Sequence, residues 1–215
     1  QALTARAHAY HWLAQFHAPT YVGNQSEPCV PLKIESTEEH MPISTVGEVY
    51  NQIVADLDEA IQLFEASESD VNRPAKSYID LQVAQGIRAR VALCMEDWTT
   101  AIAMAQDARA GYALMSNDEM TGGFNDFTVG EWMWGFDIND EQSTIYASFF
   151  SHMDPTRLSY ASLGLQKQMP AYLFDTIPDT DIRRALFVEP GDSTWFDPWG
   201  AAIPTYVGVK FNTGS

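Results

Sequence analysis

The sequence predicts a mostly α-helical protein in which antiparallel helix pairs build a scaffold and a loop-rich, partly β segment follows them. Two observations indicate this fold class. Apolar residues recur at three- and four-residue steps through the first half of the chain, with short polar corners between the resulting helices. After residue 112, clusters of glycine, proline and aromatic residues replace that helical period.

The composition is that of a globular chain. Of its 215 residues, 46% are hydrophobic and 19% are charged, which leaves enough apolar material to bury a core. The net charge of −17 argues against a nucleic-acid-binding surface and against attraction to anionic membranes. No apolar run reaches the roughly 18 residues that a membrane-spanning helix needs. Because the sequence shows neither a start methionine nor a signal peptide, we expect a trimmed or partial chain.

The first predicted helix covers Ala2–Ala18 and ends at Pro19. One side of it carries the apolar residues Ala9, Trp12, Leu13 and Phe16. His8 and His11 are three residues apart and could both reach one metal ion. No carboxylate stands at a matching step, so exposed or hydrogen-bonded histidines are favoured over a metal site. A proline-rich loop with a short extended piece at Val30–Ile34 follows.

The second predicted helix, Thr45–Ala66, begins with a capping box formed by Thr45 and Glu48. Its apolar residues keep the helical step, and three acidic residues are expected to lie solvated on the opposite face: Asp56, Asp58 and Glu59. Cys29, in the loop, and Cys94 could form one disulfide or none, and they lack the spacing of a metal site.

A helical hairpin is predicted next, from Ser77–Leu93 and Asp97–Ala110, with a corner so short that the two helices must be antiparallel neighbours. Ser77 followed by Asp80 resembles a helix cap, and Gly111 stands where the second helix stops. Small residues between the apolar ones let the backbones approach closely. These lengths and corners resemble tetratricopeptide-type helix pairs.

The remainder is predicted as a strand at Glu131–Ile138, a short helix at Gln166–Phe174 interrupted by Pro170, and a loop feeding a short helix over Asp175–Phe187. Trp132 and Trp134 would face the same side of that strand, buried against the helices. We therefore predict a helical scaffold at residues 1–112 and a loop-rich ligand-binding part at residues 113–215, packed on the scaffold as one structural unit.

Aromatic side chains in the loop-rich part are the candidate ligand-binding residues. Flat rings stack on the apolar faces of sugar rings, while a few polar side chains bind the hydroxyl groups. The candidates are Phe150, Tyr160, Trp195, Phe196, Trp199 and Tyr206. Two tryptophans four residues apart in a Pro/Gly loop are the sharpest signal. The alternative is that one or both fill the core beneath the loop. Nothing in the sequence selects a polar partner among Arg157, Asp192, Asp197 and Asn212.

Catalysis is not predicted, and no catalytic residue, metal or cofactor is assigned. No nucleophile-elbow, P-loop, zinc-protease or dinucleotide-binding motif occurs. Carboxylates are so abundant that a pair at glycosidase spacing carries no information. Asp175, Asp179 and Asp181 could bind calcium, but their spacing differs from that of an EF-hand loop, and a solvated turn is favoured.

Several stretches, in order, resemble the SusD/RagB family of outer-membrane glycan-binding lipoproteins. They are ALTARAHAYHWLAQFHAP, TVGEVYNQIVADLDEAIQLF, ARVALCMEDWTTAIAMAQDA, EWMWGFDI, LFDTIPDTDIRRALF and TYVGVKF. The third is the most specific match, because it is similar to the family's hairpin with Asp-Trp at its corner. Ala18 stands where the family usually has glycine. The family's members are about twice as long, so the resemblance implies that both ends are missing here.

The resemblance implies a superhelix of tetratricopeptide-like pairs carrying a shallow glycan site, and no enzymatic activity. It also implies a surface-exposed, lipid-anchored place at the outer membrane and docking to a TonB-dependent, SusC-like transporter during nutrient uptake. Neither Cys29 nor Cys94 is placed to be the lipid-bearing cysteine, which the resemblance locates before this chain. The alternatives are a tetratricopeptide-type adaptor for proteins or peptides and a RagB-like peptide-capture lipoprotein. Exposed rings at Trp195 and Trp199 would favour glycan binding, and buried rings the alternatives.

Overall fold

The computed structural model describes residues 1–36, 38–67, 73–136 and 147–212. The chain divides into two compact units. The helical unit consists of Gln1–Tyr112 together with Met133–Gly135. The loop unit consists of Ala113–Trp132 and Phe136–Ser215. The mostly helical fold class predicted from the sequence is confirmed, and among the described residues no helix is long and apolar enough to cross a membrane.

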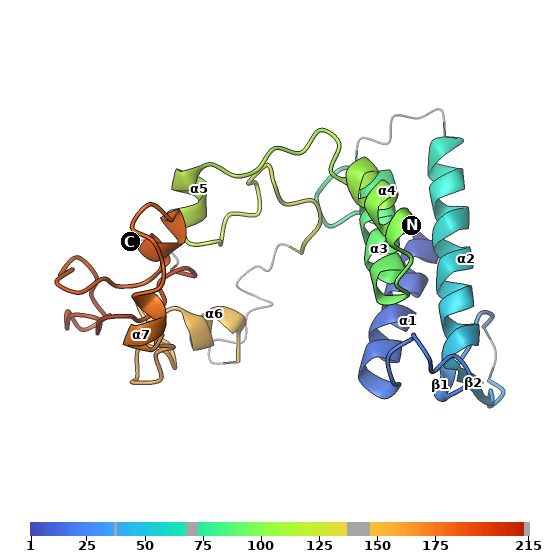
Figure 1. Cartoon of the computed structure of the whole chain (residues 1–215), viewed down its shortest axis with the longest axis horizontal. Helices are drawn as coiled ribbons and strands as arrows, with labels where there is room; N and C mark the ends of the chain where they lie inside the picture. Colours follow the sequence, from blue (N-terminus) through green and yellow to red (C-terminus); the bar gives the residue numbers. More distant parts are fainter. Residues whose placement is uncertain (37, 68–72, 137–146, 213–215) are drawn as a thin grey trace. The chain divides into compact units, whose positions relative to one another are not determined.

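The helical unit holds four long helices and one small sheet (Figure 1). The helices are α1 (Ala2–His17), α2 (Val46–Glu65), α3 (Leu81–Cys94) and α4 (Trp98–Ala108). Each packs beside the next along the chain, as expected for antiparallel helix pairs. Strands β1 (Pro28–Pro31) and β2 (Ile43–Thr45) pair antiparallel, with an irregularity between the paired positions Pro28–Thr45 and Pro31–Ile43.

Side-chain caps fix where three of these helices begin. The capping box of Thr45 and Glu48 at the start of α2 is confirmed. Asp97 caps α4 by accepting a hydrogen bond from the backbone of Thr100. The cap of α3 is Asp80, which accepts from the backbone of Val83, and not Ser77. That helix therefore begins four residues later than predicted, because only a side chain directly before the first turn reaches its free N–H groups.

The core of the helical unit lies between α1, α2 and α3. The apolar stripe of α2 supplies its centre, with Ile53 and Leu57 fully buried. The buried partners on the flanking elements are Ala7, Tyr10, Ala14, Val30, Ile79, Val83, Ile87 and Val91. The steps of α2 and α3 are the ones that the sequence pattern displayed. For α1 the predicted apolar face is wrong: Ala9, Trp12, Leu13 and Phe16 are exposed, and the helix turns its other side to the core.

One acidic residue of α2 is not solvated, contrary to the prediction. Asp56 is only 2% exposed and forms an ion pair with Arg6 of α1 at 2.6 Å. Asp58 pairs with the buried Arg88 of α3 at 2.8 Å, and its own side chain remains 47% exposed. Glu59 is exposed as expected. The sequence pattern failed here because a carboxylate at the edge of an apolar stripe can be buried when a neighbouring helix brings an arginine to it.

The described residues of the loop unit form only short regular elements. They are α5 (Asn117–Thr121), α6 (Phe149–Met153), α7 (Ala171–Phe174) and the 3-10 helix η1 (Ile182–Leu186). Helix α7 begins directly after Pro170, and η1 lies inside the predicted loop-and-helix region. A small core of Val188, Ile203, Val207 and Val209 holds the later part together, with Trp195 packed against it. Three isolated antiparallel bridges connect neighbouring segments.

The strand predicted at Glu131–Ile138 is absent from its described part, residues 131–136, and its last two residues lie outside the described ones. The backbone N–H of Gly135 donates to the carbonyl of Lys76, and the indole of Trp134 donates to the carbonyl of Ser77. These bonds tie the segment to the chain before α3, so it joins no sheet. Trp132 belongs to the loop unit and Trp134 to the helical unit, so the two rings do not share a face.

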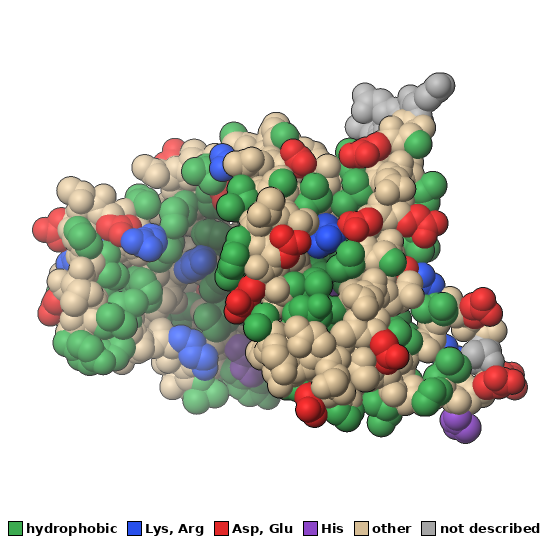
Figure 2. All heavy atoms as spheres, turned by 45° about the vertical axis from the view of Figure 1, so that its right-hand side comes forward, with side chains coloured by type: hydrophobic (Ala, Val, Ile, Leu, Met, Phe, Trp, Pro, Cys, Tyr) green, Lys and Arg blue, Asp and Glu red, His purple; other side chains and the backbone are tan. Residues whose placement is uncertain are grey.

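Acidic side chains are scattered among hydrophobic ones on the surface of the helical unit that is turned forward in Figure 2. This mixture fits a chain with 29 acidic residues against 12 lysines and arginines. The apolar groups between the charges leave room for uncharged or amphipathic partners.

Candidate functional site

Residues Trp195–Ile203 form a small hairpin in the loop unit. The backbone N–H of Ile203 donates to the carbonyl of Trp195 at 3.0 Å, and that of Asp197 donates to Ala201 at 2.9 Å. Phe196 and Ala202 form an antiparallel bridge between these two bonds. The Trp-Phe-Asp-Pro-Trp run is therefore one strand and the tip of a hairpin, rather than an irregular loop.

Asp197 fixes the tip of this hairpin. Its carbonyl accepts from the N–H of Gly200 at 3.0 Å, which closes a four-residue turn. Its carboxylate oxygen Oδ1 accepts from the N–H groups of Trp199 and Ala201 at 2.9 and 2.8 Å. Gly200 takes a positive φ of 81°, which glycine adopts without strain. The backbone beneath Trp199 is thus held by the side chain of one aspartate.

The hairpin displays two aromatic side chains and buries part of a third. Phe196 is 50% exposed and Trp199 is 58% exposed. Trp195 is half-buried and packs on the core cluster of the loop unit. Adjacent residues of a strand point to opposite sides, which explains why Trp195 turns inward and Phe196 outward. Each of the two expectations for these tryptophans therefore holds for one ring. Trp195 packs on the core, and Trp199 is exposed and available to a ligand.

The other three aromatic candidates lie in different parts of the loop unit. Tyr160 stacks on His152 with ring centroids 5.3 Å apart. Phe150 belongs to α6 and packs edge-on against Phe149. Tyr206 is half-buried, and its ring centroid lies 5.1 Å from that of Phe174. Its backbone N–H and its carbonyl are both hydrogen-bonded. Tyr206 therefore has a structural role, while Tyr160 and Phe150 are no part of the hairpin.

Most of the polar candidates are engaged in local structure. Asp192 accepts from the backbone and the hydroxyl of Thr194, and these hydrogen bonds lower the pKa of its carboxyl. The side chain of Asn212 is buried and donates to the carbonyl of Val209. Asp197 holds the hairpin tip. Their side chains therefore shape the surface around the aromatic rings.

The acidic turn before η1 pairs with arginines. Asp181 binds Arg183 at 2.5 Å, and these hydrogen bonds lower the pKa of its carboxyl to about 2. Arg184 lies 3.5 Å from Asp179 and 3.3 Å from Glu189. In the part of the chain that the structure describes, no three His, Cys, Asp or Glu side chains are grouped so that they could hold a metal ion.

A hollow of about 120 Å³ beside Trp132 was not predicted. It is lined by Phe124, Trp132 and the polar side chains Glu119, Asn125 and Asp126. Lys210 lies 4.4 Å above the ring of Phe124. An indole ring next to carboxylate and amide groups is a combination of side chains that can also bind a sugar. The Gly122-Gly123 turn was visible in the sequence, but nothing in it indicated that Trp132 would close a cavity there.

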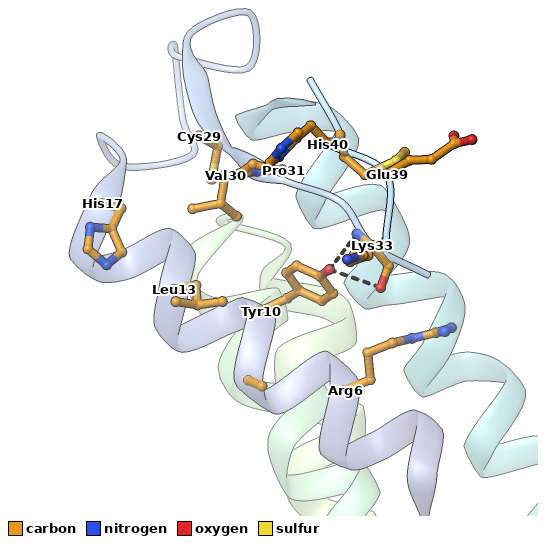
Figure 3. A pocket seen from close by; sticks show the side chains of 12 residues that line it. Arg6, Tyr10, Leu13, His17, Cys29, Val30, Pro31, Lys33, Glu39 and His40 are labelled. Atoms are coloured by element: carbon orange, nitrogen blue, oxygen red, sulfur yellow. Dashed lines mark hydrogen bonds between the residues drawn. The ribbon is translucent and has the colours of Figure 1, made fainter. Parts of the chain in front are cut away.

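A second unpredicted pocket, of about 700 Å³, opens between α1, β1 and the following loop of the helical unit (Figure 3). Arg6, Tyr10, Leu13 and Lys33 line it, among others. The hydroxyl of Tyr10 accepts from the N–H of Lys33 at 2.6 Å and donates to its carbonyl at 3.2 Å, which pins the loop to α1. The pocket is lined by cations, a carboxylate and apolar groups. This mixed lining does not indicate one class of ligand.

The histidines and cysteines of the helical unit contact protein groups. His8 accepts from the indole of Trp12 at 3.0 Å, as expected for a hydrogen-bonded histidine. The Nε2 atom of His11 lies 2.7 Å from the amide nitrogen of Gln15, while its buried Nδ1 has no partner in the described structure. Cys29 and Cys94 are both free thiols, and burial raises the pKa of Cys29.

Comparisons with known proteins identify the fold. A SusD-like carbohydrate-binding protein from Bacteroides vulgatus is 31% identical, with a TM-score of 0.79 over 99% of this chain and 44% of that one. A SusD superfamily protein from Bacteroides thetaiotaomicron is 18% identical (TM-score 0.68; 98% and 49% covered). Surface glycan-binding protein A from Bacteroides uniformis is 17% identical (TM-score 0.61; 100% and 46% covered). Comparison with curated proteins gave no match.

These structures place the chain in the class of proteins with the SusD superfamily fold. Residues 1–91 also match the SusD-like family model described as "starch-binding associating with outer membrane". The chain is thus similar to this SusD-like family over residues 1–91 and has the SusD fold over nearly its whole length, as the sequence motifs indicated. It spans about half the length of the solved structures that it matches.

Proposed function

We propose that this chain is part of a non-enzymatic glycan-binding protein and that Phe196 and Trp199 form its stacking platform. The observation that carries the proposal is the hairpin Trp195–Ile203, in which both rings are at least half exposed and Asp197 holds the backbone of Trp199. Similarity of residues 1–91 to a family described as starch-binding supports the ligand class.

The chemistry of such a platform follows from its rigidity. A sugar ring has an apolar face that packs on an aromatic ring, and hydroxyl groups at its edge that stay hydrated or find polar partners. Because the turn is already closed by hydrogen bonds, little conformational entropy is lost when Trp199 meets a sugar. Shallow aromatic binding needs no acid, base or nucleophile, which is consistent with a capture role.

The cellular setting is also part of the proposal. The family description associates these proteins with the outer membrane. We propose a surface-exposed, lipid-anchored protein that hands its oligosaccharide to a TonB-dependent, SusC-like transporter. Co-purification of the full-length protein with an outer-membrane transporter would support this setting, and its recovery as a soluble periplasmic protein would contradict it.

Calorimetric titration with starch-derived oligosaccharides, then plant, host and microbial glycans, tests the ligand. We expect one glycan class to bind, with Trp199→Ala or Phe196→Ala weakening binding about tenfold or more and leaving the melting temperature unchanged. Tyr172→Ala is the matched control, since Tyr172 is 76% exposed on α7, outside the hairpin. Equal affinity in all variants would remove the hairpin from the site.

A peptide ligand is the second candidate. The observation that favours it is an apolar groove in the helical unit, lined by the half-exposed side chains of Leu93, Trp98 and Ile102. A tetratricopeptide-type adaptor, or a RagB-like protein that captures peptides, would use such a surface. Failure of every glycan in the panel, together with binding of a peptide library, would move the assignment to this candidate.

A further inference from the structure

The groove between α3 and α4 is a hollow of about 470 Å³ with an apolar lining. Small residues form its floor: Gly86, Ala89, Ala101, Ala105 and Ala108. Leu93, Trp98 and Ile102 stand beside this floor, and each is more than half exposed. A single exposed apolar side chain is normal, but several large ones exposed together on one helix pair indicate an interaction surface.

The dimensions of the groove suit a helix. It follows the whole of α4, whose 11 residues extend about 16 Å, or three helical turns. A floor of glycine and alanine lets another backbone approach closely, and side chains at one-turn intervals on that backbone fill the depression. A Cβ added at Gly86 would lie 3.8 Å from the Cβ of Ala108, so α3 and α4 approach each other closely at this point of the floor.

Two arginines give the groove a charge. Arg6, Arg73, Arg88, Arg183 and Arg184 each have a carboxylate within 4.0 Å, as expected in a chain of net charge −17. Arg90 and Arg109 are exposed, and neither is paired with a carboxylate in the described parts of the chain. Both line this groove. This apolar groove therefore carries two exposed guanidinium groups that are available to a partner.

The guanidinium groups of Arg90 and Arg109 stand about one helical turn apart along the groove. Gly86 of α3 lies beside Ala108 of α4, so Arg109 stands near the level of Gly86. Arg90 follows Gly86 by four residues, which is about 6 Å along α3, or one helical turn. A helix lying in the groove would therefore meet both arginines with carboxylates about one turn apart.

We propose that the α3–α4 groove docks an amphipathic helix of a partner protein whose apolar stripe is flanked by carboxylates one turn apart. The apolar stripe fills the floor between Trp98 and Ala108, and the carboxylates pair with Arg90 and Arg109. Complementary charge selects the partner and speeds its association, while burial of the apolar stripe supplies the affinity. This surface is independent of the glycan platform on the loop unit.

Fluorescence anisotropy with a labelled 18-residue helical peptide tests the proposal. The peptide carries leucines at three- and four-residue steps with glutamates beside them, and a matched peptide has lysine at each glutamate. The 215-residue chain should bind the glutamate peptide about tenfold more tightly than the lysine peptide at low salt. The double variant Arg90→Glu/Arg109→Glu should reverse this preference, and Ile102→Glu should weaken both peptides.

Lys33→Glu/Lys167→Glu is the matched control, because it changes the net charge equally at exposed lysines that do not line the groove. Circular dichroism checks that each variant folds, and unchanged glycan titration shows that the loop unit is intact. Equal affinity for both peptides, or an unchanged preference in the arginine variant, would overturn the proposal. So would a dimer in sedimentation that Ile102→Glu abolishes, since a second copy would then occupy the groove, or binding to anionic vesicles but to neither peptide.

Discussion

The guanidinium of Arg6 in α1 grips the carboxylate of Asp56 in α2 through two parallel hydrogen bonds of 2.7 and 2.6 Å. Gln52 donates a third bond to the same carboxylate, also at 2.7 Å. The remaining nitrogen of Arg6 donates to the carbonyl of Ile34 at 2.9 Å. One buried aspartate thus joins the first two helices and, through Arg6, the loop that follows β1.

Replacing this aspartate should destabilise the helical unit. Asp56→Asn leaves Arg6 without its counter-charge, and we expect a loss of about 2 kcal/mol in the free energy of unfolding. The cost stays below that of a fully buried pair because Arg6 is partly exposed. Urea denaturation followed by circular dichroism measures it. Glu59→Gln removes the same charge three residues on, at an exposed position, and should change stability by less than about 0.5 kcal/mol.

His11 should make the stability of the protein depend on pH. Burial, then the neighbouring His8 and Arg90, lower the pKa of His11 from 6.5 to about 4 in the folded chain. As the pH falls, the unfolded chain therefore binds the proton at His11 before the folded chain does. The contribution of His11 to the free energy of unfolding is complete above pH 6.5 and is lost between pH 6.5 and 4. We expect a loss of about 2 kcal/mol between pH 7.5 and pH 5.

The measurement is the urea midpoint at both pH values for the native chain and for His11→Leu. The difference between the two chains isolates His11 from the carboxylates that titrate in the same range. Identical slopes against pH in both chains would show that His11 is not buried in its neutral form.

Asp197 should matter for ligand binding more than for stability. Asp197→Ala removes both hydrogen bonds that hold Trp199 and Ala201, so the displayed ring loses its fixed position. Glycan affinity should fall about tenfold or less, with the melting temperature nearly unchanged. Asp192→Ala is the control, because Asp192 makes the same kind of turn with Thr194 in the same loop. If both variants bind equally well, the rigidity of the tip plays no part.

Gly123 should tolerate no side chain. It has a φ of 107°, and an added Cβ would lie 1.8 Å from the backbone oxygen of Asn212. Gly123→Ala should therefore destabilise the loop unit by about 3 kcal/mol or prevent its folding. Gly200→Ala places a Cβ at a similar positive φ in open space and should cost about 1 kcal/mol. Thermal denaturation of both variants separates the clash from the backbone strain.

The helices could be predicted because their signals are local. The apolar step of α2 and the capping box of Thr45 lie within one segment of sequence, and both reappear in the structure. Such features depend on neighbours a few residues away, so periodicity and turn chemistry are enough to find them. The helix predicted at Gln166–Phe174 was only half right, because residues before Pro170 are not helical and α7 begins after it.

The failures depended on distant partners. Asp56 looked solvated because the pattern of α2 could not reveal that Arg6 would reach it from fifty residues away. The alternating Glu131–Ile138 resembled a strand, but the hydrogen bonds of Trp134 and Gly135 go to the chain before α3. Alternation describes the faces of a segment and says nothing about whether a pairing strand exists.

The candidate site was only partly predictable for the same reason. The Trp195–Trp199 run was conspicuous, yet its division into a core tryptophan and a displayed one follows from the bridge between Phe196 and Ala202. The hollow beside Trp132 and the unpaired charges of Arg90 and Arg109 exist only once the fold has assembled them. These surfaces could not be found from composition or spacing.

The return of Met133–Gly135 to the helical unit limits how this protein can be divided or recombined. A fragment ending at Tyr112 would lack the indole that donates to the carbonyl of Ser77 and the methionine that lies beside Gly86. A single proteolytic cut between Ala113 and Trp132 would leave Met133–Gly135 attached to the loop unit, so that only the noncovalent contacts of this segment would hold the two fragments together. A single genetic crossover within the same stretch would likewise pair the helices of one protein with the returning segment of another.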